Sequence, residues 1–210
     1  MTIRQSALIG LVAFSMLLSG WFAVYPPNTL LQLGPVLLAI LLSPWLLRRF
    51  PLSDASLTFI VAFLLIHNLA ACWTYSDVPY DIWGRKLFGR SIDAALGFRR
   101  NQFDRLVHFS FGVLAIYPVT EIAQRYFALG RRAALYSAVS FVVGFGALYE
   151  IFEWLLAVFM DPASADAYNG QQGDVFDSQK DMAIAAVGAL LALPVVARFS
   201  GTAQARIAAR

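Results

Sequence analysis

Residues 173–199 read GDVFDSQKDMAIAAVGALLALPVVARF, an apolar segment that begins with three aspartates. Only 16 consecutive residues after the last aspartate are free of charge, which corresponds to about 24 Å of helix. Because the hydrocarbon core of a bilayer is about 30 Å thick, a membrane-spanning helix is predicted to start near Asp174. Asp174, Asp177 and Asp181 then lie within about 60° of one another and form an acidic stripe.

Helix capping is a second interpretation of the first two aspartates. Asp174 can serve as the N-cap and Asp177 can occupy the third helical position, where a carboxylate stabilises the positive end of the helix. Asp181 lies a full turn deeper, so capping does not account for it.

The composition extends the membrane interpretation to the whole chain. The 210 residues are 59% hydrophobic and 14% charged, whereas a soluble domain is about 45–50% apolar and about 25% charged. The single cysteine, Cys72, excludes an intramolecular disulfide and a cysteine-based zinc site. We therefore expect one all-α polytopic integral membrane domain, 1–210, with about six transmembrane helices. The expected spans are about 6–24, 31–47, 55–73, 104–123, 133–160 and 178–198, with an outer loop at 74–103.

The charges predict the orientation in the bilayer. Nine basic residues flank one side of the expected spans and seven flank the other, so the positive-inside rule places both termini in the cytoplasm. The basic residues lie at the ends of apolar segments, where they fix topology, and nucleic acid is not an expected partner. The cytoplasmic set comprises Arg4, Arg48, Arg49, Arg125, Arg131, Arg132, Arg198, Arg206 and Arg210.

Two further spans carry ionisable residues towards the outer side. The fourth opens with NQFDRLVHF, in which Asn101 is a candidate N-cap and Asp104 and His108 share a face. The fifth contains GFGALYEIFEW, where Glu150 and Glu153 lie on one face among apolar residues. Its glycines, Gly144 and Gly146, favour close packing or a bend.

Glu121 is predicted at the opposite membrane face as an interfacial charge. His67 of the third span lies at a depth compatible with the acidic residues.

Six carboxylates in one partly dehydrated site need compensation by a divalent metal, by protons or by arginines. Oxygen ligands favour Mg²⁺, Ca²⁺ or Mn²⁺, and a histidine ligand shifts the preference towards Mn²⁺, Fe²⁺ or Zn²⁺. The candidate metal ligands are Asp104, His108, Glu150, Glu153, Asp177, Asp181 and His67, of which the first six are also candidate acid–base groups. The candidate substrate-binding residues are Arg99, Arg100, Arg105, Tyr149 and Gln172.

The outer loop contains WTYSDVPYDIWGRKLFGR, in which aromatic and basic residues are interspersed. This pattern is typical of a short helix at the headgroup level, serving either as an aromatic belt or as a lid over a substrate. The chain has no Gly-x-Ser-x-Gly elbow, no His-Glu-x-x-His and no P-loop. These absences exclude hydrolases with a serine nucleophile elbow, zinc metalloproteases of that motif and P-loop nucleotide-binding proteins.

The segments WTYSDVPYDIW, NQFDRLVHF, YEIFEW and GQQGDVFDSQKDM resemble the YjdF-like bacterial inner-membrane proteins over about residues 60–190. The resemblance implies a multi-pass protein of the bacterial inner membrane and supplies no activity. The chain also resembles, more distantly, the VanZ-like membrane proteins through Asp104, Arg105, His108 and Phe109. That likeness departs from the family pattern at Gln171–Gln172 and Ala185, and it implies cell-envelope lipid or glycan chemistry only by analogy.

Three functional hypotheses follow from these patterns. The first is a divalent-cation site facing the outer leaflet that binds or acts on a lipid headgroup or another envelope precursor. The second is a cation- or proton-coupled transporter, which needs polar residues that continue to the inner side. The third is a non-catalytic assembly or stability factor in which the acidic residues only hold helices together.

Overall fold

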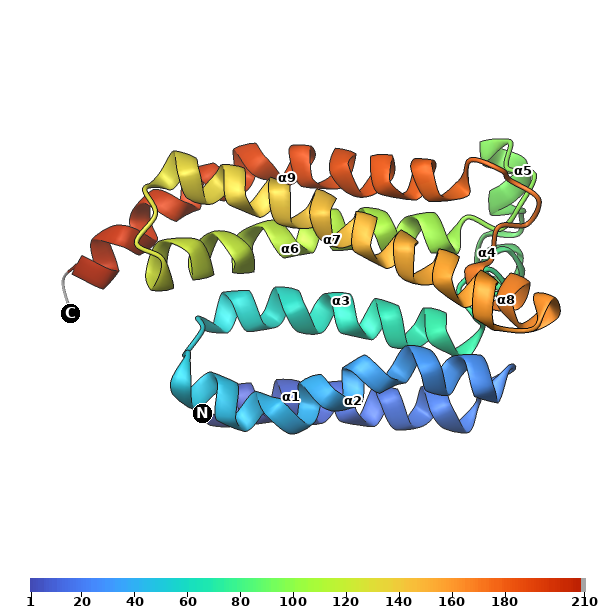
Figure 1. Ribbon diagram of the computed structural model, residues 1–210, viewed down its shortest axis with the longest axis horizontal. Coiled ribbons are helices and arrows are strands. Elements are labelled where there is room, and N and C mark those ends of the chain that lie inside the picture. Colours follow the sequence, from blue (N-terminus) through green and yellow to red (C-terminus); the bar gives the residue numbers. More distant parts are fainter. Residues whose placement is uncertain (209–210) are drawn as a thin grey trace.

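A computed structural model describes the backbone of residues 1–208 and the side chains of residues 1–199. Arg210 and the side chain of Arg206, both counted among the cytoplasmic basic residues, therefore lie outside the described part. All regular secondary structure in the described chain is helical, and no strand is present there (Figure 1). Its helices are α1 (Ile3–Trp21), α2 (Pro26–Arg49), α3 (Asp54–Cys72), α4 (Tyr80–Phe88), α5 (Ile92–Leu96), α6 (Phe103–Tyr126), α7 (Arg131–Phe159), α8 (Pro162–Asn169) and α9 (Asp177–Ala208).

Six of these helices, α1, α2, α3, α6, α7 and α9, are long and apolar enough to cross a membrane. They form two groups of three, α1–α2–α3 and α6–α7–α9, and the groups meet where α3 packs on α6. The most extensive helix pairing in the molecule is between α6 and α9. The expected all-α membrane fold with six spans is confirmed.

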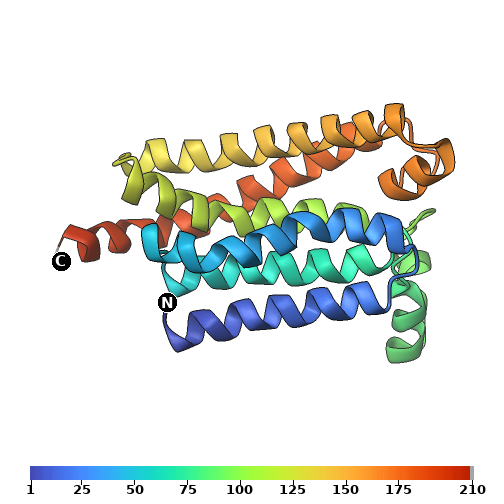
Figure 2. The same cartoon turned by 60° about the horizontal axis from the view of Figure 1, so that its bottom comes forward.

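The two ends of the bundle differ in character. The short helices α4, α5 and α8 lie at one end, and the N-terminus and the end of α9 lie at the other (Figures 1 and 2). We call these the short-helix end and the terminal end. The short-helix end corresponds to the side that the charge pattern predicts to face outward.

Local sequence signals explain where several helices begin and end. Ser53 caps α3 by accepting a hydrogen bond from the Ser56 amide. Pro26 opens α2, earlier than the hydropathy pattern indicates, because proline is favoured in the first helical turn. Glycines in the left-handed region end α4, α5 and α8.

Two expectations about helix starts are wrong. The last helix begins at Asp177, not near Asp174, and it gains its length by running past Arg198 at the terminal end. The N-cap position of α6 is Gln102, and Asn101 instead accepts a hydrogen bond from the Phe103 amide while donating one to the Val78 carbonyl oxygen. Asn101 therefore ties α6 to the loop after α3.

The loop between the third and fourth spans is a folded unit. Asp81 of α4 accepts hydrogen bonds from the Ser91 hydroxyl at 2.7 Å and from the Asp93 amide at 3.0 Å. Tyr80 donates to Asp93 and accepts from the Gln102 amide, which connects α4 and α5 to the start of α6. The predicted short helix is therefore present as α4, and α5 and α8 are two further short helices that the sequence patterns did not reveal.

Candidate functional site

Three ionisable side chains from α6 and α9 meet near the start of both helices. Asp104 and His108 lie one turn apart on α6, with Nε2 of His108 3.5 Å from Oδ1 of Asp104. Asp181 approaches them from α9, and one ligand atom from each of the three side chains lies within 4.8 Å of the other two. All three side chains are buried. The three side chains are close enough together to be ligands of a single metal ion.

Two glycines allow α6 and α9 to approach each other closely beneath this group. A Cβ atom on Gly112 would overlap the carbonyl oxygen of Ala185, and one on Gly188 would lie 2.5 Å from the carbonyl oxygen of Phe109. Gly112 lies one turn after His108, and Gly188 lies two turns after Asp181. Glycine at both positions therefore sets the separation of the ligand-bearing turns.

Helix α7 contributes a third carboxylate. Glu150 is 6% exposed, and its Oε1 lies 3.9 Å from Nε2 of His108. Tyr149 packs edge-on against the His108 ring, with 5.9 Å between the ring centroids. Glu153, one turn further along α7, is half-buried and close enough to interact with Asp104 and Glu150. We call Asp104, His108, Glu150 and Asp181 the buried acidic cluster.

A second set of charges lies beside this cluster, at the start of α9. Oδ1 of Asp177 accepts hydrogen bonds from Arg100 at 2.5 Å and from Arg105 at 3.2 Å. Asp174 accepts hydrogen bonds from Arg105 at 2.6 Å and from Lys180 at 2.6 and 2.8 Å. The hydrogen bonds from Lys180 hold the pKa of the Asp174 carboxyl well below its usual range. We call these five residues the ion-pair network.

The two sets differ in how their charge is balanced. The ion-pair network places three cations against two carboxylates, so its aspartates are fully compensated. In the buried acidic cluster, three carboxylates face a single histidine and the edge of Arg105, which lies within ion-pair distance of Asp181. Oδ1 of Asp181, in a side chain 2% exposed, and Oε1 of Glu150 are buried and accept no hydrogen bond from the described residues. Arg105 Nε, at 3.8 Å from Asp181 Oδ1, is too distant to donate one.

Comparison with known proteins places the chain in a family. Residues 4–201 match the model of a family described as predicted membrane protein (DUF2238). The chain belongs to this family. It is also 32% identical over 171 residues to the inner membrane protein YjdF of Escherichia coli (strain K12), covering 81% of this chain and 78% of that protein. No solved structure matches the chain.

The DUF2238 match and the six apolar helices make the chain a multi-pass integral membrane protein. The matched range, 4–201, contains every residue of the buried acidic cluster and of the ion-pair network. The predicted resemblance to the YjdF-like proteins is therefore confirmed. The more distant resemblance to VanZ-like proteins stays a prediction, and no activity comes with the family.

Other residues predicted for the site lie around it or apart from it. Gln172 ties two loops together, since its side chain accepts a hydrogen bond from the Asn101 amide and donates one to the Asn101 carbonyl oxygen. Arg99 is exposed and makes no ion pair with the described residues. His67 bonds through Nε2 to the Gln32 carbonyl oxygen and through Nδ1 to the Tyr75 hydroxyl, and it is not part of the group of potential ligands.

The sequence patterns also missed or misplaced some structural residues. Glu121, expected as an interfacial charge, accepts hydrogen bonds from the Ser53 amide at 2.8 Å and from the hydroxyls of Ser53 and Ser56. It therefore joins α6 to the start of α3. A Cβ on Gly144 or Gly146 would meet no atom within 4 Å, so close packing, the first of the two alternatives expected there, is wrong, and the bend stays a prediction. Gly112 and Gly188 do pack closely. Gly112 shares a helix face with His108, and Gly188 shares one with Asp181, so their spacing in the sequence is the signal that could have identified them.

Proposed function

We propose that the buried acidic cluster holds one divalent cation, with Asp104, His108 and Asp181 as ligands and Glu150 as a fourth ligand or as a base beside it. The convergence of three ligand atoms from two helices within 4.8 Å carries this proposal. The oxygens of Asp181 and Glu150 that accept no hydrogen bond support it, because buried carboxylates that are only partly compensated are unfavourable. A donor set of carboxylates and one imidazole favours Mn²⁺, Zn²⁺ or Fe²⁺, while the carboxylates alone would accept Mg²⁺ or Ca²⁺.

The ligand of such a site would be the phosphate-bearing headgroup of an envelope lipid in the leaflet at the short-helix end. A bound cation would supply positive charge to a phosphate oxygen. Two guanidiniums lie beside the site, and Nη2 of Arg100 and Nε of Arg105 are buried and donate no hydrogen bond to the described residues. Arginine recognises phosphate through such paired donors. In this proposal, Asp177 orients the guanidiniums of Arg100 and Arg105. Glu153 acts as an acid–base group near the site.

In this proposal the protein lies in the bacterial inner membrane with both termini in the cytoplasm. A transport function receives less support, because Glu121, the polar candidate towards the other face, is engaged with Ser53, Ser56 and Arg125. The hypothesis of a non-catalytic stability factor has one supporting observation, the ion-pair network, which joins the start of α9 to Arg100 and Arg105.

Elemental mass spectrometry of detergent-purified protein separates these functions. The wild type should carry about one divalent metal ion per chain, and Asp181→Asn should lose it. Asp174→Asn is the matched control, because it makes the same change in the ion-pair network and should keep the metal. A wild-type protein that is well folded and free of metal would contradict the proposal and would favour the stability factor.

A further inference from the structure

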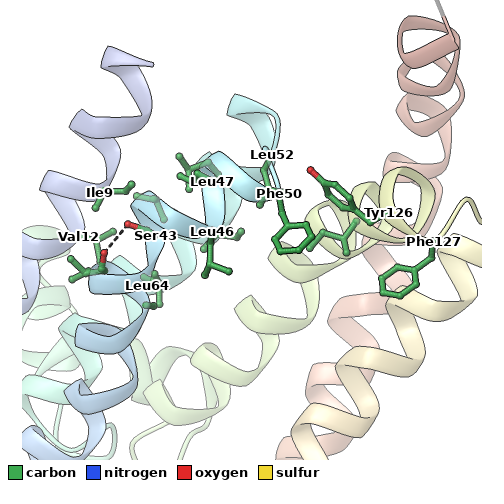
Figure 3. Close-up of a pocket in the computed structure, with 16 residues that line it drawn as sticks. Ile9, Val12, Ser43, Leu46, Leu47, Phe50, Leu52, Leu64, Tyr126 and Phe127 are labelled. Atoms are coloured by element: carbon green, nitrogen blue, oxygen red, sulfur yellow. Dashed lines mark hydrogen bonds between the residues drawn. The ribbon is translucent and has the colours of Figure 1, made fainter. Parts of the chain in front are cut away.

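An apolar cavity of about 450 Å³ opens on the other half of the molecule, between α1, α2, α3 and α6 (Figure 3). Its volume lies within the range of about 300–1,000 Å³ that is usual for ligand pockets. Its inner wall is formed by buried side chains such as Val12, Leu57 and Val61. Leu46, Phe50 and Phe127 also line it and are exposed, so the cavity opens on the outer surface of the helix bundle.

The cavity has the length of one lipid tail. Its lining residues on α2 and at the C-cap of that helix run from Ala39 to Phe50, which is about 16 Å along the helix axis. One leaflet contributes half of a hydrocarbon core that is about 30 Å thick. The cavity therefore reaches from the helix ends at the terminal end to about the middle of the membrane. An acyl chain of the same leaflet has this depth and this chemistry.

The mouth of the cavity carries cations and lies at the helix ends, where the headgroups of a surrounding bilayer are expected. Phe50 and Tyr126 meet edge to face there, with 5.5 Å between their ring centroids. The guanidinium of Arg49 stacks on Phe50 at 5.2 Å, and that of Arg125 stacks on Tyr126 at 5.7 Å. Arg125 is paired with Glu121, whereas no carboxylate of the described residues pairs with Arg49. The guanidinium of Arg49 is therefore available to a phosphate.

From this geometry we infer a binding site for an anionic phospholipid, with one acyl chain in the cavity and the headgroup phosphate on Arg49, flanked by Arg125. The surrounding charge fits an anionic ligand, because Arg4, Arg48 and Arg131 also lie at the terminal end. If this end faces the cytoplasm, as the positive-inside rule predicts, its leaflet supplies anionic lipids. The site is separate from the buried acidic cluster and does not depend on the proposed metal.

Native mass spectrometry of the full chain in detergent, with added dioleoyl phosphatidylglycerol or dioleoyl phosphatidylcholine, tests this inference. The wild type should retain one phosphatidylglycerol molecule in clear preference to phosphatidylcholine. Arg49→Gln should weaken retention of phosphatidylglycerol about fivefold, as expected for the loss of one basic contact near a membrane surface. Arg132→Gln, which removes the same charge from an exposed position at the same end, should leave retention unchanged.

A second variant tests the cavity independently of charge. Ala39→Phe places a ring in the cavity from an exposed position on α2 and should abolish retention of the phospholipid without lowering the melting temperature. If that variant unfolds, Ser43→Leu fills the cavity from the same helix and loses only a hydrogen bond to the Ile40 carbonyl oxygen. Equal retention of the two lipids, full retention by the filled variants, or an equal loss in Arg132→Gln and Arg49→Gln would overturn the inference.

Discussion

At the scale of single residues, the positions that bear the candidate ligands and the positions that bring them together are different. Asp104, His108 and Asp181 supply the ionisable groups, whereas Gly112 and Gly188 set the distance between α6 and α9. Since backbone atoms of the opposite helix lie where each missing Cβ would be, neither glycine position can accept a methyl group without moving a helix. The close approach of the two helices and the proposed metal binding should therefore be lost together.

Gly188→Ala tests this dependence. Forcing a methyl group against the Phe109 carbonyl oxygen should lower the free energy of unfolding by about 1–3 kcal/mol and should also reduce metal content. Thermal unfolding and elemental analysis of the same preparation measure the two effects. Gly144→Ala is the matched control, because a Cβ there meets open space and alanine is the better helix former. Equal effects of the two substitutions would contradict the role of the close approach.

The convergence of Asp104, His108 and Asp181 could be predicted from sequence because an ionisable group in an apolar helix is unfavourable unless it faces a polar interior. The ion pairs could not, since Arg100 and Asp177 are 77 positions apart and only the fold brings them together. The same reason explains why close packing occurs at Gly112 and Gly188 and not at Gly144 and Gly146. Gly144 and Gly146 form a conspicuous pair in the sequence, but close packing depends on which helix lies opposite.

At the scale of elements, the six spans follow from hydropathy, whereas their starts follow from local chemistry. Glu121 joins α6 to the cap of α3, and no pattern within either helix indicates that contact. Similarly, the side chains of Tyr80 and Asp81 hold α4 to α5, and Asp81 bonds to groups about ten positions further along the chain. Such contacts turn a long loop into a folded unit at the short-helix end.

The docking of α4 on α5 should depend on pH through Asp81. Hydrogen bonds from the Asp93 amide and the Ser91 hydroxyl lower the pKa of this carboxyl from 3.8 to about 2. Because the pKa is depressed in the folded state, the stabilisation is complete above about pH 4 and is lost as the pH falls through about 2. Fluorescence of Trp83, which packs edge-on against Trp73, should report the release of α4 in this range.

Asp81→Asn should remove this transition, because the amide does not titrate, while Asp174→Asn should leave it in place. The second variant matters because the pKa of Asp174 is also depressed, and that residue lies in the ion-pair network and not on α4. An unchanged acid transition in Asp81→Asn would show that another group controls the docking of α4.

At the scale of the whole molecule, the two ends are chemically distinct sites separated by apolar cores. The buried acidic cluster and the ion-pair network lie at the short-helix end, and the cavity with its arginines opens towards the terminal end. Clusters of buried apolar residues occupy the space between them, including Ile116, Val142 and Ala189 in the second group of helices. The orientation of the bundle therefore decides which leaflet each site meets.

Cysteine labelling determines that orientation with one pair of variants. The N-terminus and the end of α9 lie at the terminal end, so one accessible position at each end of the bundle orients all six spans (Figure 1). The native Cys72 is buried and is replaced by serine to remove background. Gln171→Cys, at an exposed position of the short-helix end, should react with a membrane-impermeant maleimide added to intact cells. Gly130→Cys, exposed between α6 and α7, should react only after the membrane is permeabilised. The reverse labelling pattern would place the short-helix end, with the buried acidic cluster, on the cytoplasmic side. The excess of basic residues at the terminal end would then face outward, which contradicts the positive-inside rule.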